Sequence, residues 1–284
     1  MTAGTAHAVG APRRRATLPL RVELVRQLSQ WRVVSAVGVL LALPIVVRVA
    51  FLLGGAAPSQ TGTDLAGLAQ ASGGSFAAFV LLVSGGYFVT IVTAVLFGDL
   101  IAGEASRSTL KYLLALPVPR MRLLGVKAAA AALILLGGLV GMTAVALLVG
   151  VVSYGPGGMQ VPNGPRLDLG QTLLRLGLST AVTPFGLLWA AALGVLLSVL
   201  TDSPLAAAGG VVVVSIVTRA LDQVEALQDF RLWLPTHYAF AYQQFLLQPI
   251  DLHPVADAFL NGMLWIIVVG PAAAWWFWRK DVRG

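Results

Sequence analysis

Side chains that could bind a metal, carry a proton or attack a substrate are few in this sequence and lie far apart. Cysteine is absent, which excludes disulfides and thiolate metal sites. The wide spacing matches neither the clustered ligands of a zinc site nor the paired glutamates of a membrane protease. The sequence therefore predicts no catalytic, metal-binding or cofactor-binding residue. The acids and imidazoles in question are Glu23, Glu104, Glu225, His7, His237 and His253.

The lysines do not form a nucleotide-binding loop. A Walker A loop places its lysine directly after a glycine, and none of Lys111, Lys127 and Lys280 follows a glycine. The motifs His-Glu-x-x-His and Gly-x-Ser-x-Gly are also absent. We therefore expect a non-catalytic chain that cannot bind ATP through this loop.

Charged side chains gather in one stretch, residues 99–127, which separates two long apolar runs. The stretch holds five Lys/Arg, the acids Asp99 and Glu104, and a Pro-Val-Pro break at 117–119. Leucines recur at helical spacing before the break, and a second helical piece follows Pro119. One interpretation is a solvated, positively charged loop. The apolar face of the first helical piece favours the other interpretation, a docking surface for a partner protein.

The motifs of this stretch resemble those of the ABC-2 family of ABC-transporter permeases. The shared order is a glutamate, a Thr-Leu pair, Leu-Leu, Pro-Val and a distal Gly-x-Lys at 125–127, with Ser108 where the family usually has glycine. The resemblance implies that the loop carries a coupling helix, which docks on a separate ATP-binding subunit. The residues it assigns to partner coupling are Glu104, Arg107, Ser108, Thr109, Leu110, Leu113, Leu114, Pro117 and Arg120.

The same resemblance implies the rest of the assembly. Two permease copies, identical or paralogous, would pair with two ATP-binding subunits, which would bind ATP and Mg and drive export. Small residues, Gly85-Gly86 in the second span and Ala206 and Gly210 in the fifth, predict contact between these spans across a two-fold axis. The residues that line the substrate path and the substrate itself are not identified by the sequence.

Composition sets the fold class. Hydrophobic residues make up 57% of the 284 residues and charged residues 11%, well below the roughly 25% charge of soluble domains. We expect an all-α integral membrane protein: a disordered cytoplasmic segment at 1–17, then one transmembrane domain over 18–284. This domain would contain an interfacial helix at 18–32, the coupling segment at 99–127, and six spans at about 33–54, 75–98, 128–152, 171–200, 205–221 and 255–278.

The distribution of basic residues predicts the orientation. Fourteen of the 19 Lys and Arg precede the first span, lie in 99–127 or follow the last span. By the positive-inside rule, this places both termini and the coupling segment in the cytoplasm of a protein in the cell membrane. The net charge of +7 is then topological: it indicates contact with membrane lipids and does not indicate nucleic-acid binding.

Several local features predict particular structures. Pro184 should kink the fourth span, with Thr180 and Thr183 accommodating the freed backbone groups. Arg48 should reach the interface from the outer third of the first span. The interfacial helix has an apolar arc that includes Val22 and Val25 and an opposite arc that includes Glu23 and Gln27. An aromatic belt is expected from Phe230, Trp233, Tyr238, Phe240, Tyr242 and Phe245.

Two other functions remain open at this point. The chain could be an ion-coupled carrier or channel, or a membrane scaffold without transport. Proton- and sodium-driven carriers usually place a carboxylate well inside a span. No Asp or Glu lies well inside any of the six expected ranges, which counts against an ion-coupled carrier.

Overall fold

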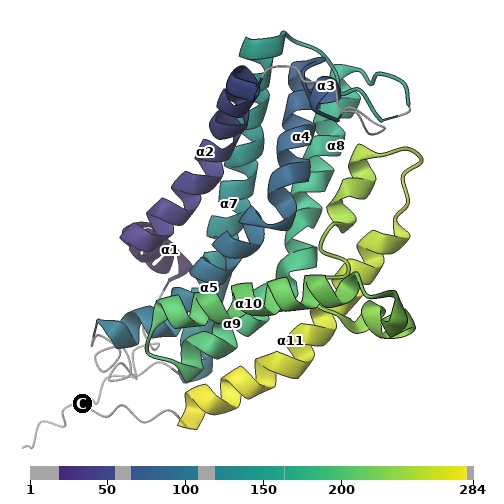
Figure 1. Ribbon diagram of the computed structural model, residues 1–284. Helices are drawn as coiled ribbons and strands as arrows, with labels where there is room; N and C mark the ends of the chain where they lie inside the picture. The colour runs from purple at the N-terminus through teal and green to yellow at the C-terminus, as the bar shows by residue number, and fades with distance from the viewer. Residues whose placement is uncertain (1–18, 55–64, 108–118, 163, 280–284) are drawn as a thin grey trace, which may run out of the picture.

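The computed structural model describes residues 19–54, 65–107, 119–162 and 164–279. Within them the fold is almost entirely helical, with one isolated β-bridge between Gln160 and Arg166 (Figure 1). Six helical segments are long and apolar enough to cross a membrane, which confirms an all-α membrane protein. The predicted disordered segment at 1–17 and most of the predicted coupling helix lie outside the described residues.

The spanning segments are α2 (Trp31–Gly54), α5 (Phe88–Ser106), α7 (Arg120–Tyr154), α8 to α9 (Leu169–Leu200), α10 (Pro204–Asp222) and α11 (His253–Arg279). Shorter elements connect them: α1 (Leu20–Leu28), α3 (Leu65–Ala69), α4 (Gly73–Gly86), and the 3-10 helices η2 (Glu225–Trp233) and η3 (Ala241–Leu246).

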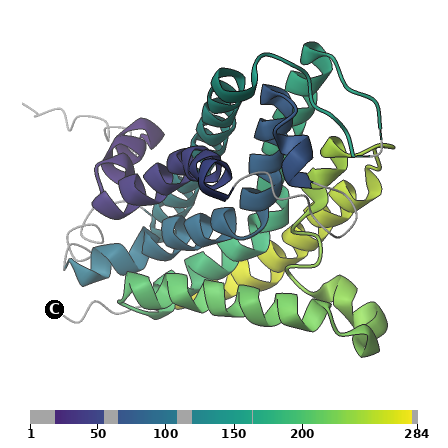
Figure 2. The same cartoon turned by 45° about the horizontal axis from the view of Figure 1, so that its top comes forward.

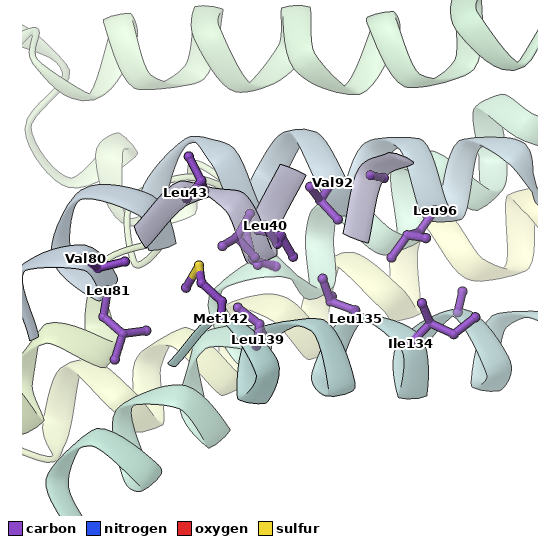
Figure 3. Close-up of a cluster of buried hydrophobic side chains, with 14 of the residues drawn as sticks. Leu40, Leu43, Val80, Leu81, Val92, Leu96, Ile134, Leu135, Leu139 and Met142 are labelled. Atoms are coloured by element: carbon purple, nitrogen blue, oxygen red, sulfur yellow. The ribbon is translucent and has the colours of Figure 1, made fainter. Parts of the chain in front are cut away.

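The helices form two packed groups. In one, α7 packs against α2 and α4; in the other, α9 lies between α5 and α11, and α10 packs on α5 (Figures 1 and 2). Large apolar side chains fill the space where the groups meet, among them Leu40 of α2, Leu96 of α5, and Leu139 and Met142 of α7 (Figure 3). These four side chains are almost fully buried, and close packing of this kind holds helices together in lipid.

The second span differs from its predicted range of 75–98. Helix α4 ends at Gly86, the chain changes direction at Tyr87, and α5 continues to Ser106. Asp99 and Glu104 therefore belong to the last turns of a spanning helix, beyond the end of the predicted range. Both side chains are ion-paired, Asp99 with Arg32 and Glu104 with Lys127.

Residues Gly85 and Gly86 do not form an open face for a second copy. A Cβ at Gly85 would collide with the ring of Tyr242, and one at Gly86 with the ring of Phe240, both from the same chain. Likewise, α5 and α10 pack on each other within one chain, where Gly98 lies against Ala208. The proposed dimer contact at Gly85-Gly86 is wrong for this reason, while the dimer itself stays a prediction.

The fourth span breaks at the expected place. The 3-10 helix η1 (Thr183–Leu187) separates α8 (Leu169–Val182) from α9 (Leu188–Leu200). The hydroxyl of Thr183 donates to the carbonyl of Ser179 at 2.8 Å, and that of Thr180 to the carbonyl of Leu176 at 2.7 Å. The predicted kink at Pro184 is confirmed, although both hydroxyls bond the turn before the proline.

The aromatic side chains between α10 and α11 differ in exposure. Phe230 and Trp233 are exposed, but Tyr242 and Phe245 are buried, because η3 packs against α8. Burial raises the pKa of Tyr242 to about 12, so its hydroxyl remains protonated and donates to the carbonyl of Leu82 at 3.1 Å. Tyr242 and Phe245 are therefore packing residues within the bundle, and the ring of Tyr242 lies against Gly85 near the break between α4 and α5. The position of the aromatic segment at the membrane boundary stays a prediction.

Candidate functional site: a buried charge cluster at the ends of α5 and α7

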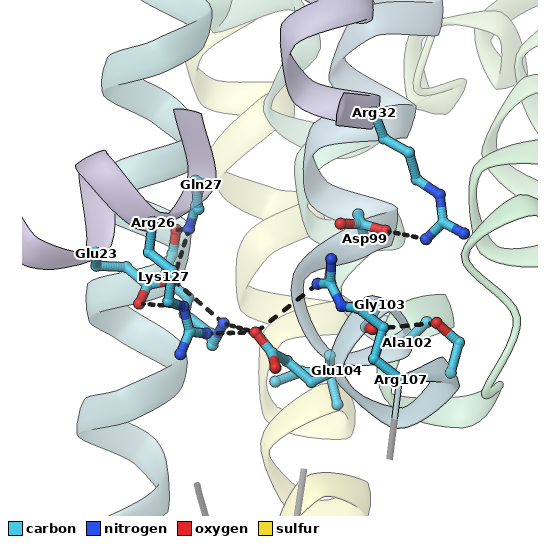
Figure 4. Close-up of polar contacts among 12 residues, drawn as sticks. Glu23, Arg26, Gln27, Arg32, Asp99, Ala102, Gly103, Glu104, Arg107 and Lys127 are labelled. Atoms are coloured by element: carbon cyan, nitrogen blue, oxygen red, sulfur yellow. Dashed lines mark hydrogen bonds and ion pairs between the residues drawn. The ribbon is translucent and has the colours of Figure 1, made fainter. Parts of the chain in front are cut away.

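Four charged side chains from three helices meet at the end of the bundle where α5 ends and α7 begins (Figure 4). Glu23 and Arg26 come from α1, Glu104 from α5 and Lys127 from α7. We call these four residues the charge cluster. Helix α1 packs against α7, so residues about 100 positions apart in sequence become neighbours.

Lys127 lies at the centre of the charge cluster. Its Nζ is 3.1 Å from Oε1 of Glu23 and 3.2 Å from Oε1 of Glu104. Arg26 closes the cluster by donating to Glu104, and its Nε lies 3.4 Å from Oε2 of Glu23. Gln27 supports the arrangement: its Nε2 donates to Oε1 of Glu23 at 3.1 Å and to the backbone carbonyl of Lys127 at 3.0 Å.

Three of the four side chains in the charge cluster are buried, Arg26 being 34% exposed, and the four formal charges cancel. Glu23 is 0% exposed, Lys127 1% and Glu104 4%. Such burial is tolerated only when each charge has a partner, because an unpaired ion in a low-dielectric interior costs several kcal/mol. The ion pairs of the charge cluster connect α1, α5 and α7 to one another. Among the described residues, no three His, Asp or Glu side chains lie close enough to hold a metal ion together.

Helix α1 has the two arcs that the sequence predicts, and the structure shows where each points. Its polar arc faces the protein, where Glu23 and Gln27 are buried, while Val22 and Val25 are more than half exposed. In water this orientation would be unfavourable, but at a membrane surface the exposed apolar arc can contact lipid. The interfacial position of α1 remains a prediction.

The last turns of α5 are also held by a second ion pair and by hydrogen bonds to a serine hydroxyl. Arg32 of α2 donates to Oδ1 of Asp99 at 2.9 Å (Figure 4). The hydroxyl oxygen of Ser198 in α9 accepts from the backbone N–H groups of Ile101 and Ala102 at 2.8 and 2.9 Å. The end of α5 is therefore fixed to α1, α2, α7 and α9 at once.

Three of the predicted coupling residues fall within the described residues. Glu104 belongs to the charge cluster, and the side chain of Arg107 is partly exposed, with Nη2 4.0 Å from Glu104. Arg120 instead connects α7 to the end of α11, donating to the carbonyl of Trp278 at 2.9 Å. The predicted coupling residues outside the described ranges are Ser108, Thr109, Leu110, Leu113, Leu114 and Pro117.

Comparison with protein families resolves what kind of protein carries this arrangement. The family model for the ABC-2 family transporter protein matches residues 28–218, more than half of the chain. The chain belongs to the ABC-2 transporter family. It is thus a multi-pass membrane permease of the ABC-transporter type, and permeases of this family are in general non-catalytic subunits associated with an ATP-binding cassette subunit. A search of curated proteins found no match.

Sequence reasoning missed most of this ABC-2 permease's charge cluster. The motifs assign Glu104 to partner coupling, but they assign no site to Glu23, Arg26 or Lys127. A signal was present at both ends: Glu23 and Gln27 are four residues apart on one helix face, and Lys127 ends the Gly-x-Lys motif. Neither signal predicts that α1 packs against α7.

Proposed function

We propose that this chain is the membrane subunit of an ATP-driven exporter and that the segment between α5 and α7 docks on a separate ATP-binding subunit. The observation that carries the proposal is the ion pair between Glu104 and Lys127. These two residues lie on the two helices that border the segment. A displacement of the segment would move the end of α5 and the start of α7 together, because the ion pair between Glu104 and Lys127 connects them.

The proposed assembly contains two permease copies and two ATP-binding subunits, which supply the sites for ATP and Mg. The cytoplasmic face of the cell membrane would hold the charge cluster, both termini and the docking segment, in agreement with the distribution of Lys and Arg. In this arrangement Glu104, Lys127, Glu23 and Arg26 are positioning residues that transmit movement and do not touch nucleotide.

The exporter proposal is tested by Glu104→Gln in the complex reconstituted into lipid vesicles. The variant keeps the size of the side chain and removes the charge that Lys127 and Arg26 share. We expect the ATP-binding subunit to stay bound and hydrolyse ATP. Transport of the compound that co-purifies with the wild-type complex should fall at least about tenfold per ATP, as for a loss of about 1.4 kcal/mol in coupling free energy.

Glu225→Gln is the matched control, because Glu225 is exposed in η2 and lies outside the charge cluster. It should behave as wild type. Equal transport per ATP in wild type and Glu104→Gln would refute a coupling role for the cluster. Transport driven by an ion gradient without any ATP-binding subunit would instead select the ion-coupled carrier.

A further inference from the structure

A groove of about 350 Å³ opens on the surface of the bundle between α2, α5 and α10. Ligand sites in proteins are typically clefts of about 300–1,000 Å³, so the groove is large enough to hold part of a small molecule or a lipid chain. It is separate from the charge cluster, since none of its lining residues belongs to that cluster. Its lining includes Ala36 and Val39 of α2, Ile91 and Val95 of α5, and Leu205 of α10.

The groove is polar at one end and apolar along the rest. Along α2 the lining runs from Arg32 to Val39, and along α5 from Asp99 back to Ile91. At 1.5 Å per residue, either wall is roughly 10–12 Å long. The ion pair between Arg32 and Asp99 stands at the polar end, beside the helix ends where a membrane surface is expected.

The two members of that ion pair differ in accessibility. The side chain of Arg32 is 51% exposed and that of Asp99 only 5%. The carboxylate of Asp99 packs against the backbone of α5 at Gly103: a Cβ at Gly103 would lie 2.6 Å from Oδ1 of Asp99. The carboxylate is thus a fixed internal support for Arg32. Within the described residues Asp99 is the one side-chain partner of the Arg32 guanidinium, which has five N–H donors in total.

We infer that this groove binds a membrane phospholipid, with its phosphate on Arg32 and part of one acyl chain along Val39, Ile91 and Val95. A guanidinium pairs with phosphate through two parallel hydrogen bonds, and basic sites between membrane helices recognise lipid head groups. An amphiphile has the same polarity as the groove, charged at one end and apolar along the other roughly 10 Å. The exposed apolar walls, with Leu205 83% exposed, are open to the lipid phase.

The inference is tested on the full-length chain in detergent, without any ATP-binding subunit, so its failure would not affect the exporter proposal. Native mass spectrometry measures binding of phosphatidylglycerol and of diacylglycerol with the same acyl chains. Wild type should bind phosphatidylglycerol at least about tenfold more tightly, since its phosphate can form charge-assisted hydrogen bonds with Arg32 and diacylglycerol has no phosphate. Arg32→Gln should abolish this preference, and Val39→Trp, which fills the groove from an exposed position, should weaken binding of both lipids.

Two further variants sharpen the test. Arg122→Gln removes an exposed arginine near the start of α7 that does not line the groove, and it should keep the preference. Asp99→Asn leaves Arg32 in place and should also keep it, which separates loss of the phosphate ligand from loss of the ion pair. Three results would overturn the inference: equal losses in Arg32→Gln and Arg122→Gln, wild-type lipid binding in Val39→Trp, or cross-linking of Leu205→Cys between two copies that excludes lipid from the groove.

Discussion

Lys127 and Glu104 form an ion pair, 3.2 Å between Nζ and Oε1, that joins the start of α7 to the end of α5. The two helices border the segment proposed to dock on the ATP-binding subunit. The pair is buried and is shared with Glu23 and Arg26, so the junction is fixed by charges from three helices.

Lys127→Met should strongly destabilise the protein, because it leaves Glu23 and Glu104 buried without their shared cation. Breaking a buried ion pair from one side costs about 3–5 kcal/mol, which thermal unfolding of the detergent-solubilised protein would detect. Arg122→Met, an exposed position in the same helix, is the control and should change stability by less than about 0.5 kcal/mol. Equal melting temperatures for the two variants would show that the charge cluster does not hold these helices.

The sequence predicts the helices far better than their contacts. The six apolar segments follow from hydropathy, and the break at η1 follows from Pro184, because both signals are local in the chain. The ring of Tyr242 against Gly85 depends on residues more than 150 positions apart, and no local pattern indicates it. The charge cluster also depends on residues far apart in sequence. The sequence places Glu23 on the polar face of α1, but it does not indicate whether that face contacts water or α7.

The orientation of the chain can be measured with single cysteines, because the natural sequence contains none. An impermeant maleimide added outside intact cells should label Glu225→Cys and should not label Ser106→Cys. Both residues are exposed, so both variants should react after the membrane is permeabilised. Labelling of Ser106→Cys alone in intact cells would reverse the topology and place the charge cluster outside.

Gly86→Ala should destabilise the break between α4 and α5. The added methyl group would overlap the ring of Phe240, which is itself in contact with Tyr87 and Tyr242 and cannot move away freely. Overpacking of this kind typically costs about 1–3 kcal/mol, measured as a lower unfolding temperature in detergent.

Gly137→Ala is the matched control for that substitution. Gly137 is also helical, but its Cβ would meet nothing within 4 Å, and alanine is the better helix former by about 1 kcal/mol. This variant should be as stable as wild type or slightly more stable. If both alanine variants behave alike, Phe240 does not pack on α4 as described.

The central claim, that residues 107–119 dock on a separate ATP-binding subunit, is tested most directly by affinity purification of the complex. Leu113→Asp should reduce the ATP-binding subunit recovered with the chain at least about tenfold, because burial of one leucine contributes roughly 1.5–3 kcal/mol. The amount of chain inserted in the membrane should equal that of wild type. Full recovery of the ATP-binding subunit with Leu113→Asp would contradict the account.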